Sequence, residues 1–129
     1  MILQVRNGLP VVSLTLEYQG RTATVCNIIL DTGAAESLID REEVKELQIE
    51  TDDDDIIVPM AGIGGRDYAL RKRIDGLRFG SYHVESLYVD FGNMDEHPGV
   101  NGLLGFDILS AGQFVIDLQS MKIYRKDSR

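Results

Sequence analysis

Alternating apolar and polar residues run through the first part of the chain in short stretches. Val11–Tyr18 alternates and is rich in β-branched residues, which predicts a strand. Gln19-Gly20 predicts a hairpin turn, because glycine supplies the positive φ that such turns require, and Arg21–Cys26 then returns as a second strand. Asn27–Leu30 is apolar after its first residue and is therefore expected to be buried on both faces.

The same pattern continues towards the C-terminus. Strands are predicted at 56–60, 68–74, 77–79 and 82–91, and a last hairpin at 113–118 and 121–124. The turn signals between these strands are Asp75-Gly76, Gly80-Ser81 and Gln119-Ser120.

Two short helices are predicted among the strands. Asp40 and Glu43 have the spacing of a capping box, and the segment 42–47 that follows carries apolar Val44 and Leu47. The second helix follows Gly105. Many short strands with frequent turns are typical of an all-β protein, either a small barrel or a sandwich.

Length and charge narrow the class of protein. The 129 residues suggest a single domain over 1–129, and the net charge of -8 argues against a nucleic-acid-binding surface. Arg71-Lys72-Arg73 is a local basic stretch that we expect on a solvated strand or turn face. The chain shows no signal peptide and no apolar run long enough for a membrane span. A soluble, cytoplasmic protein without nucleic-acid or membrane partners is therefore expected.

Candidate metal ligands are few. The single cysteine, Cys26, excludes an intrachain disulfide, and its place in an apolar strand predicts a core residue. His83 and His97 have no second ligand at a metal-binding spacing, so structural or surface roles are expected. Thr51–Asp55 offers carboxylates to calcium but lacks the spaced ligands and glycine of an EF-hand loop, which favours a solvated loop. We therefore predict neither a metal nor a cofactor.

Ala61–Asp67 forms a glycine-rich stretch between two predicted strands. Gly62, Gly64 and Gly65 surround Ile63, which favours a mobile hairpin tip that a ligand backbone can approach closely. A phosphate-binding loop is the alternative. It is disfavoured because neither a P-loop Lys-Ser/Thr pair nor a helical pattern follows.

Asp31 has the most unusual sequence position of the acidic residues. Three large apolar residues lead directly into Asp31-Thr32-Gly33, although an unpaired ionised carboxylate is costly to bury. Asp31 is either a turn residue that caps the strand or a carboxylate held in a site that excludes water.

Three stretches together resemble the retropepsin-like aspartic proteases. They are Leu30–Ala34 with its Asp-Thr-Gly, Gly62–Gly65, which resembles the flap tip, and Leu103-Leu104-Gly105, which resembles the motif before the C-terminal helix. A lone Asp-Thr-Gly is a weak motif, but the three occur in the family's order and span nearly the whole chain. The resemblance implies an all-β fold, a small closed barrel of the acid-protease type with a β-hairpin flap.

The resemblance also implies an aspartic endopeptidase that acts on peptide or protein substrates. Two carboxylates that share one proton can activate water and protonate the leaving nitrogen. Since the chain offers one such acid, Asp31, the second would come from an identical chain across a two-fold axis. Thr32 would hydrogen-bond across that axis, Gly33 would allow close approach of the substrate backbone, and Ala34 matches the retroviral residue.

The remaining carried-over positions form the flap and the second motif. The flap residues would close over an extended peptide, and Gly105 would let the following helix pack behind the catalytic loop. The flap positions are Met60, Ala61, Gly62, Ile63, Gly64 and Gly65, and those of the second motif are Leu103, Leu104 and Gly105.

Two positions depart from the retroviral pattern. Retroviral enzymes carry an aspartate and an arginine that pair and brace the dimer, where this chain has Ala35 and Phe106. Because both partners are missing together, no orphan charge is left, and apolar packing can take the place of the pair.

Two other interpretations stay open. One is a catalytically silent dimerisation or peptide-binding module of the same fold, although an intact Asp31-Thr32-Gly33 argues against it. The other is an unrelated small barrel in which Asp31 only caps a turn, and the flap-like glycines and Leu103-Leu104-Gly105 would then be coincidences.

Overall fold

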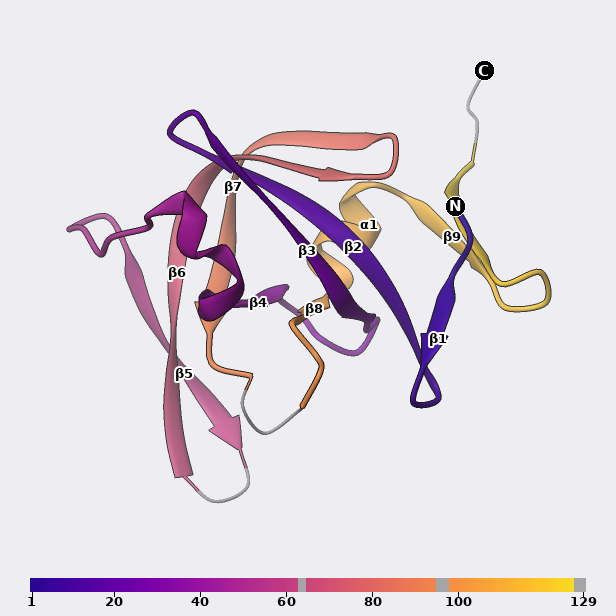
Figure 1. Cartoon of the computed structure of the whole chain (residues 1–129), viewed down its shortest axis with the longest axis horizontal. Helices are drawn as coiled ribbons and strands as arrows, with labels where there is room; N and C mark the ends of the chain where they lie inside the picture. The colour runs from indigo at the N-terminus through magenta and orange to yellow at the C-terminus, as the bar shows by residue number, and fades with distance from the viewer. Residues whose placement is uncertain (63–64, 95–97, 127–129) are drawn as a thin grey trace.

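The computed structural model describes residues 1–62, 65–94 and 98–126, and strands dominate it (Figure 1). The strands are β1 (Gln4–Arg6), β2 (Leu9–Tyr18), β3 (Arg21–Leu30), β4 (Leu38–Asp40), β5 (Ile56–Gly62), β6 (Gly65–Phe79), β7 (Tyr82–Gly92), β8 (Gly102–Leu104), β9 (Phe114–Asp117) and β10 (Lys122–Arg125). The helices are η1 (Arg41–Leu47), a 3₁₀ helix, and α1 (Phe106–Ala111). The predicted all-β class with two short helices is confirmed.

Six strands close into a barrel. Their order is β2-β3-β8-β4-β7-β6, and a further pairing of β6 with β2 joins the two ends. β1 and β5 extend this sheet, while β9 and β10 form a separate hairpin beside the N-terminus (Figure 1). The expected closed barrel is therefore confirmed. Neither described helix is long and apolar enough to cross a membrane.

The barrel interior holds the main apolar core. Residues on alternate positions of β2 and β3 point inward, and η1 adds Val44 and Leu47 from one side. The fully buried members include Leu14, Leu16, Ile28, Ile39, Leu47, Ile74, Leu77, Phe79, Leu104 and Ile123. Burying one such side chain contributes about 1.5–3 kcal/mol, so the barrel holds its strand ends in fixed positions.

A bulge in β3 corrects two predictions. Cys26 is exposed instead of buried in the core, and Asn27 and Ile29 are half-buried instead of enclosed on both faces. Asn27 has a φ of 57°, and the β2–β3 register shifts opposite it, so one extra residue enters the strand. Before the bulge the inward-facing residues have odd numbers, as Val25 does, and after it they have even numbers, as Ile28 does. Cys26 therefore lies on the outer face.

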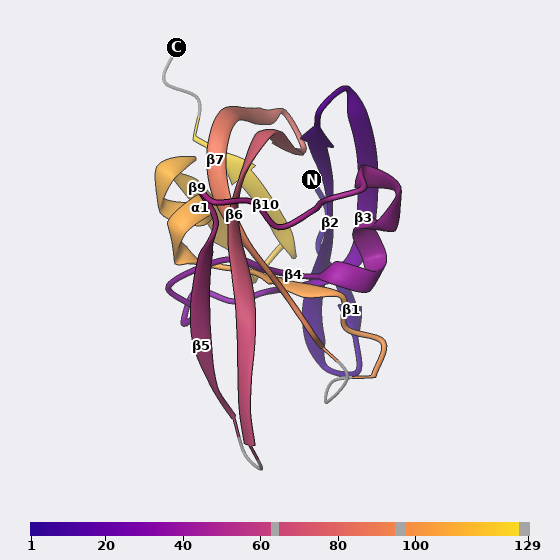
Figure 2. The ribbon, with the colours of Figure 1, turned by 90° about the vertical axis from the view of Figure 1, so that its left-hand side faces the viewer.

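β5 and β6 form a long hairpin that extends beyond the barrel (Figure 2). Their pairing runs from Ile56 opposite Arg71 to Gly62 opposite Gly65, while Ile63 and Gly64 of the predicted tip lie outside the described residues. The turn predicted at Asp75-Gly76 is wrong, because β6 continues through it to Phe79.

Gly76 allows two strands to approach each other closely and does not form a turn. It lies opposite Glu17 where β6 meets β2, and a Cβ on Gly76 would collide with the Glu17 carboxylate. That carboxylate accepts hydrogen bonds from Arg78 and contacts His83 at 3.1 Å. His83 therefore has the expected structural role, whereas His97 lies outside the described residues.

The predicted helix after Asp40 is present as η1. Asp40 caps it, because its carboxylate accepts a hydrogen bond from the Glu42 amide at 3.0 Å. The expected capping box is replaced by a different arrangement. The Asp40 amide donates to the Asn101 carbonyl at 2.9 Å, so Glu43 is not needed as its partner.

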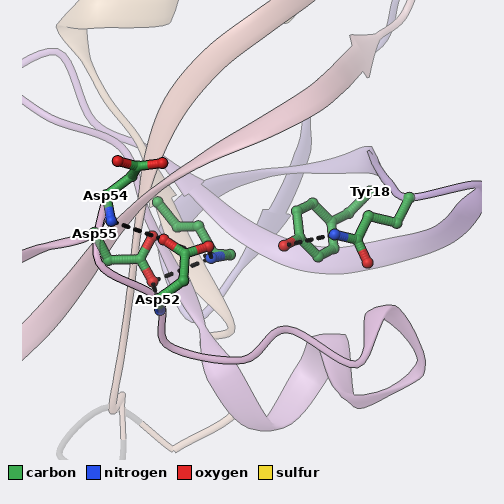
Figure 3. A network of polar contacts seen from close by, with 6 residues as sticks. Tyr18, Asp52, Asp54 and Asp55 are labelled. Atoms are coloured by element: carbon green, nitrogen blue, oxygen red, sulfur yellow. Dashed lines mark hydrogen bonds and ion pairs between the residues drawn. The ribbon is translucent and has the colours of Figure 1, made fainter.

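The acidic loop before β5 is folded onto Lys72 (Figure 3). Lys72 Nζ donates to Asp52 and to both carboxylate oxygens of Asp55, each at 3.0 Å. The side chains of Lys72 and Asp55 are only 2% and 3% exposed. The expectation of a solvated loop holds for residues 51–54, which are exposed, but is wrong for the Asp55 side chain, and the expectation of a solvated Lys72 is wrong. β6 turns Arg71 and Arg73 away from the interior and Lys72 into it, where the two acids balance its charge.

Candidate active site

Asp31 lies where two parallel strands end. β3 and β8 run side by side with Leu30 opposite Leu104, and the Asp31 amide donates to the Leu104 carbonyl at 2.9 Å. The residue is half-buried. The buried strand thus delivers a carboxylate to the edge of the barrel and fixes its backbone there.

The Asp31 carboxylate also closes a tight turn. Its Oδ1 accepts a hydrogen bond from the Gly33 amide at 2.9 Å, and the Ala34 amide donates to the Asp31 carbonyl at 3.2 Å. A Cβ on Gly33 would lie 3.3 Å from Oδ1, a tight contact that glycine avoids. The turn-capping interpretation of Asp31 therefore holds, and it does not exclude the other one, since the residue as a whole is half-buried.

Gly105 brings α1 directly behind this turn. A Cβ at Gly105 would lie 2.6 Å from the Ala34 carbonyl oxygen and 3.0 Å from the carbonyl carbon of Glu36. The Phe106 amide donates to the same Ala34 oxygen at 2.7 Å. Only a residue without a side chain allows this approach, so the motif glycine has a clear steric reason.

Ser37 and Asp107 hold the segment that follows the turn at Asp31, and the sequence analysis identified neither residue. Ser37 is 1% exposed; its hydroxyl donates to Asp107 Oδ1 at 2.7 Å and accepts the Gly105 amide at 2.8 Å. The Ser37 amide donates to Asp107 Oδ2 at 3.0 Å. One carboxylate therefore ties the segment after Asp31 to the start of α1. The only sequence signal was an acid in the first turn of the predicted helix.

An ion pair lies behind Ser37. Arg71 donates to Asp90 through Nε at 2.8 Å and Nη2 at 3.2 Å, and the Asp90 amide donates to the Ser37 carbonyl at 3.3 Å. The hydrogen bond to Asp90 raises the pKa of Arg71, and attraction to Asp90, Glu36 and Asp107 adds to this against the opposing effect of burial. β6 thus places a permanent positive charge among the acids around the turn.

A small apolar cluster connects this region to the β5–β6 hairpin. Leu38, Ala69 and Met94 are buried together, and Met60, Val100 and Leu103 pack against them. Met60 comes from β5, whereas Leu103 pairs with Ile29 just before the turn at Asp31. The outer half of the hairpin and the strand ends just before Asp31 therefore share one apolar cluster.

Comparison with known proteins agrees with this geometry. A family model described as "Aspartyl protease" matches residues 6–108, more than half of the chain. The chain belongs to the aspartyl protease family. None of the curated proteins compared with the sequence matches it.

A solved structure shows the same fold. It is the crystal structure of a retropepsin-like aspartic protease from Rickettsia conorii, with a TM-score of 0.68. The two sequences are 18% identical, and the match covers 95% of this chain and 86% of that chain. The retropepsin-like assignment from three motifs is therefore confirmed.

Within the aspartyl protease fold, the two departures from the retroviral pattern lie at the surface. Ala35 is exposed, and the Phe106 side chain is 57% exposed. The retroviral aspartate and arginine positions are thus apolar and open to solvent in this chain. Inside the chain, support for the turn at Asp31 comes from Ser37, Asp107 and Gly105.

Metal ligation finds no support in the described part of this aspartyl protease chain. No group of three or more His, Cys, Asp or Glu side chains there is placed to hold a metal ion. The carboxylates of Asp52 and Asp55 already surround the Lys72 ammonium.

Proposed function

We propose that the chain is a homodimeric aspartic endopeptidase in which Asp31 of two identical chains forms the catalytic dyad. The observation that supports this most directly is the placement of Asp31. It sits at paired strand ends with its Oδ1 held by the Gly33 amide, in a family member whose sequence contains one Asp-Thr-Gly. A single carboxylate cannot act as base and acid in one step, so the site requires a second copy.

The dyad divides the chemistry between two carboxyl groups. Carboxylates about 3 Å apart cannot both ionise, so the pair holds one proton. The ionised member takes a proton from water as the water oxygen attacks the scissile carbonyl, and the other member protonates the leaving nitrogen as the C–N bond breaks. The hydrogen bond from the Gly33 amide fixes the orientation of the Asp31 carboxylate.

The substrate would bind as an extended strand between the catalytic turn and the flap. Met60–Gly65 would pair with the substrate backbone and exclude water. Leu38, Met60 and Leu103 belong to the apolar cluster that connects the hairpin to the strand end before Asp31, so we expect apolar substrate side chains to be preferred beside the scissile bond.

A catalytically silent peptide-binding or dimerisation module is the second candidate. The observation that favours it is the replacement of the retroviral pair by Ala35 and Phe106. This candidate predicts the same dimer and the same peptide affinity without hydrolysis.

The substitution Asp31→Asn separates the two candidates. The wild type is expected to cleave members of a peptide library at mildly acidic pH, and Asp31→Asn to lose about 10²–10⁴-fold in rate while it still folds and dimerises. Asp53→Asn changes an exposed acid in the same way and should leave cleavage unchanged. Equal cleavage by wild type and Asp31→Asn would rule out the protease, and so would full activity from a strict monomer.

A further inference from the structure

A cavity of about 290 Å³ lies between η1 and the root of the β5–β6 hairpin. Its walls come from η1, from the segment 48–51 that follows η1, and from β6 and β7. Within the described part of the chain, neither the turn at Asp31 nor the apolar cluster around Leu38 contributes to these walls. The cavity is therefore separate from the candidate active site.

The floor of the cavity is apolar. Val44, Leu70 and Phe91 are 3%, 6% and 1% exposed, and the partly buried Ile49 packs against the main core beside them. Leu70 and Phe91 lie opposite each other on β6 and β7, so the barrel wall fixes their positions. Apolar walls of this kind favour an apolar group, because contact with them removes its surface from water.

The opening of the cavity carries the charges. Arg41, Glu42 and Lys45 line it and are exposed, which leaves one net positive charge from two cations and one acid. Lys45 is already paired with Glu42 at 2.8 Å. Arg41 forms no ion pair in the part of the chain that the structure describes, and its charge acts on Glu42 only from a distance. Its guanidinium therefore remains available to an anion.

Charge and size together indicate one class of ligand. A locally positive opening in a chain of net charge -8 attracts an anion, and a guanidinium matches a carboxylate with two parallel hydrogen bonds. A cavity of about 290 Å³ has room for about ten non-hydrogen atoms, at about 30 Å³ for each water-sized group.

We propose that this cavity binds a small amphipathic carboxylate. The apolar part lies against Val44, Leu70 and Phe91, and the carboxylate pairs with Arg41 at the opening. An exposed ion pair alone is weak, so the apolar contact supplies most of the affinity and Arg41 supplies the preference for an anion.

The bound molecule would also contact the hairpin that carries the predicted flap residues. Leu70 lies directly opposite Ile57 of β5, and residues paired in this way share one face of the sheet. Ile57 is 58% exposed, so the apolar surface continues from the cavity onto β5. A ligand in the cavity is thus expected to affect the backbone of both hairpin strands.

The test is a titration of the intact chain with octanoate, a carboxylate of about ten non-hydrogen atoms, followed by two-dimensional NMR. The amide signals of Arg41, Ile57 and Leu70 should shift together and saturate with a Kd of about 1 mM. Octanamide has the same size without the charge and should bind about 5- to 10-fold more weakly. Acetate has the charge without the apolar chain and should cause no saturable shift.

Two variants separate the roles of charge and space. Arg41→Gln should weaken octanoate binding about 5- to 10-fold and leave octanamide binding unchanged. Arg21→Gln removes the same charge at an exposed position outside the cavity and should bind octanoate as the wild type does. Thr51→Trp places a large ring at the opening and should abolish binding of both molecules. All three positions are exposed, so thermal unfolding should remain unchanged.

Three results would overturn the proposal. Equal octanoate affinity of wild type and Arg41→Gln would remove the role of the guanidinium, and equal affinity for octanoate and octanamide would remove the preference for a carboxylate. Shifts that persist in Thr51→Trp, or that spread over the exposed apolar residues near both termini, would show adventitious binding only. The titration uses no substrate, so an inactive or monomeric wild type would remove the proposed protease and leave this site standing.

Discussion

Ser37 joins three segments that are distant in the sequence. Its hydroxyl bonds to Asp107 and Gly105, and its carbonyl accepts the Asp90 amide. Ser37 and Asp107 are 70 residues apart. Gly105 could be found from its local motif, but the Ser37–Asp107 pair could not, because the two residues meet only when β4, which follows Ser37, pairs with β8, which precedes Gly105.

Replacing this serine should destabilise the fold and slow catalysis. Ser37→Ala leaves the Gly105 amide without its acceptor and removes one partner of Asp107, which should cost about 1–3 kcal/mol of unfolding free energy. Urea denaturation measures this loss, and kcat should fall because the turn that carries Asp31 loosens. Ser13→Ala, at an exposed position of β2, is the control. Equal stability of the two variants would contradict the role of Ser37.

The prediction that Cys26 lies in the core was wrong for a similar reason, because the bulge beside it depends on a neighbouring strand. The prediction assumed that inward and outward positions alternate without interruption along β3. The bulge at Asn27, which has a positive φ, shifts this alternation by one residue. Asparagine tolerates this conformation better than most residues, yet its presence does not require it. Whether a bulge forms depends on the neighbouring strand, whose register shifts between Val12 and Leu14.

At the scale of elements, Lys72 fixes the root of the β5–β6 hairpin. Asp52 and Asp55 precede β5 directly, and their contacts with Lys72 hold the loop against β6 (Figure 3). Lys72 Nζ also lies 5.5 Å from the centroid of the Tyr18 ring. Burial alone would lower the pKa of Lys72, but the hydrogen bonds to Asp52 and Asp55 raise it above its usual value.

Lys72→Met should therefore be strongly destabilising. It leaves the buried Asp55 carboxylate without its cation, and breaking such a pair costs about 3–5 kcal/mol. Lys45→Met is the matched control, because Lys45 pairs with Glu42 at 2.8 Å in an exposed position. Exposed pairs contribute about 0–1 kcal/mol. Thermal unfolding of both variants checks the difference, and similar losses would show that burial adds nothing to the Lys72 contacts.

The pKa shifts of Lys72 and Asp52 predict the pH range in which the wild type is more stable than Lys72→Met. A raised pKa for Lys72 means that its contribution is complete below 10.5 and is lost as the pH rises through the folded-state value. The hydrogen bond from Lys72 lowers the pKa of Asp52, so that contribution is complete above 3.8 and is lost as the pH falls through the folded-state value. The stability difference between wild type and Lys72→Met should thus be constant at mildly acidic and neutral pH and shrink at both extremes.

Strand boundaries were predicted correctly where a glycine permits a turn, and wrongly where a glycine lets a neighbouring strand approach. Gly80-Ser81 is a true turn between β6 and β7, whereas Gly76 lies inside β6. A glycine that permits a turn and a glycine that admits a neighbouring strand look alike in the sequence. Only the β2–β6 contact that closes the barrel separates the two cases.

At the scale of the whole molecule, the sequence predicted the fold class and the type of barrel, because three spaced motifs matched one family. It did not predict how the turn at Asp31 is supported. Ser37, Asp107, Arg71 and Asp90 form no motif, and they meet only once the strands are paired. The proposed assembly raises the same problem, because the proposed dyad would depend on a contact between two chains.

Mixing wild type with Asp31→Asn should reveal that contact directly. If chains exchange freely, a mixed dimer carries one Asp31 and cannot complete the dyad. Activity per wild-type chain should then equal the wild-type fraction, about one half in an equal mixture and about one tenth with a ninefold excess of the variant. Asp53→Asn in the same excess should not lower the activity per wild-type chain.

The shape of this titration distinguishes a shared site from one that each chain completes alone. A dyad built from two chains loses activity in proportion to the wild-type fraction, whereas independent sites keep the activity of every wild-type chain at any ratio.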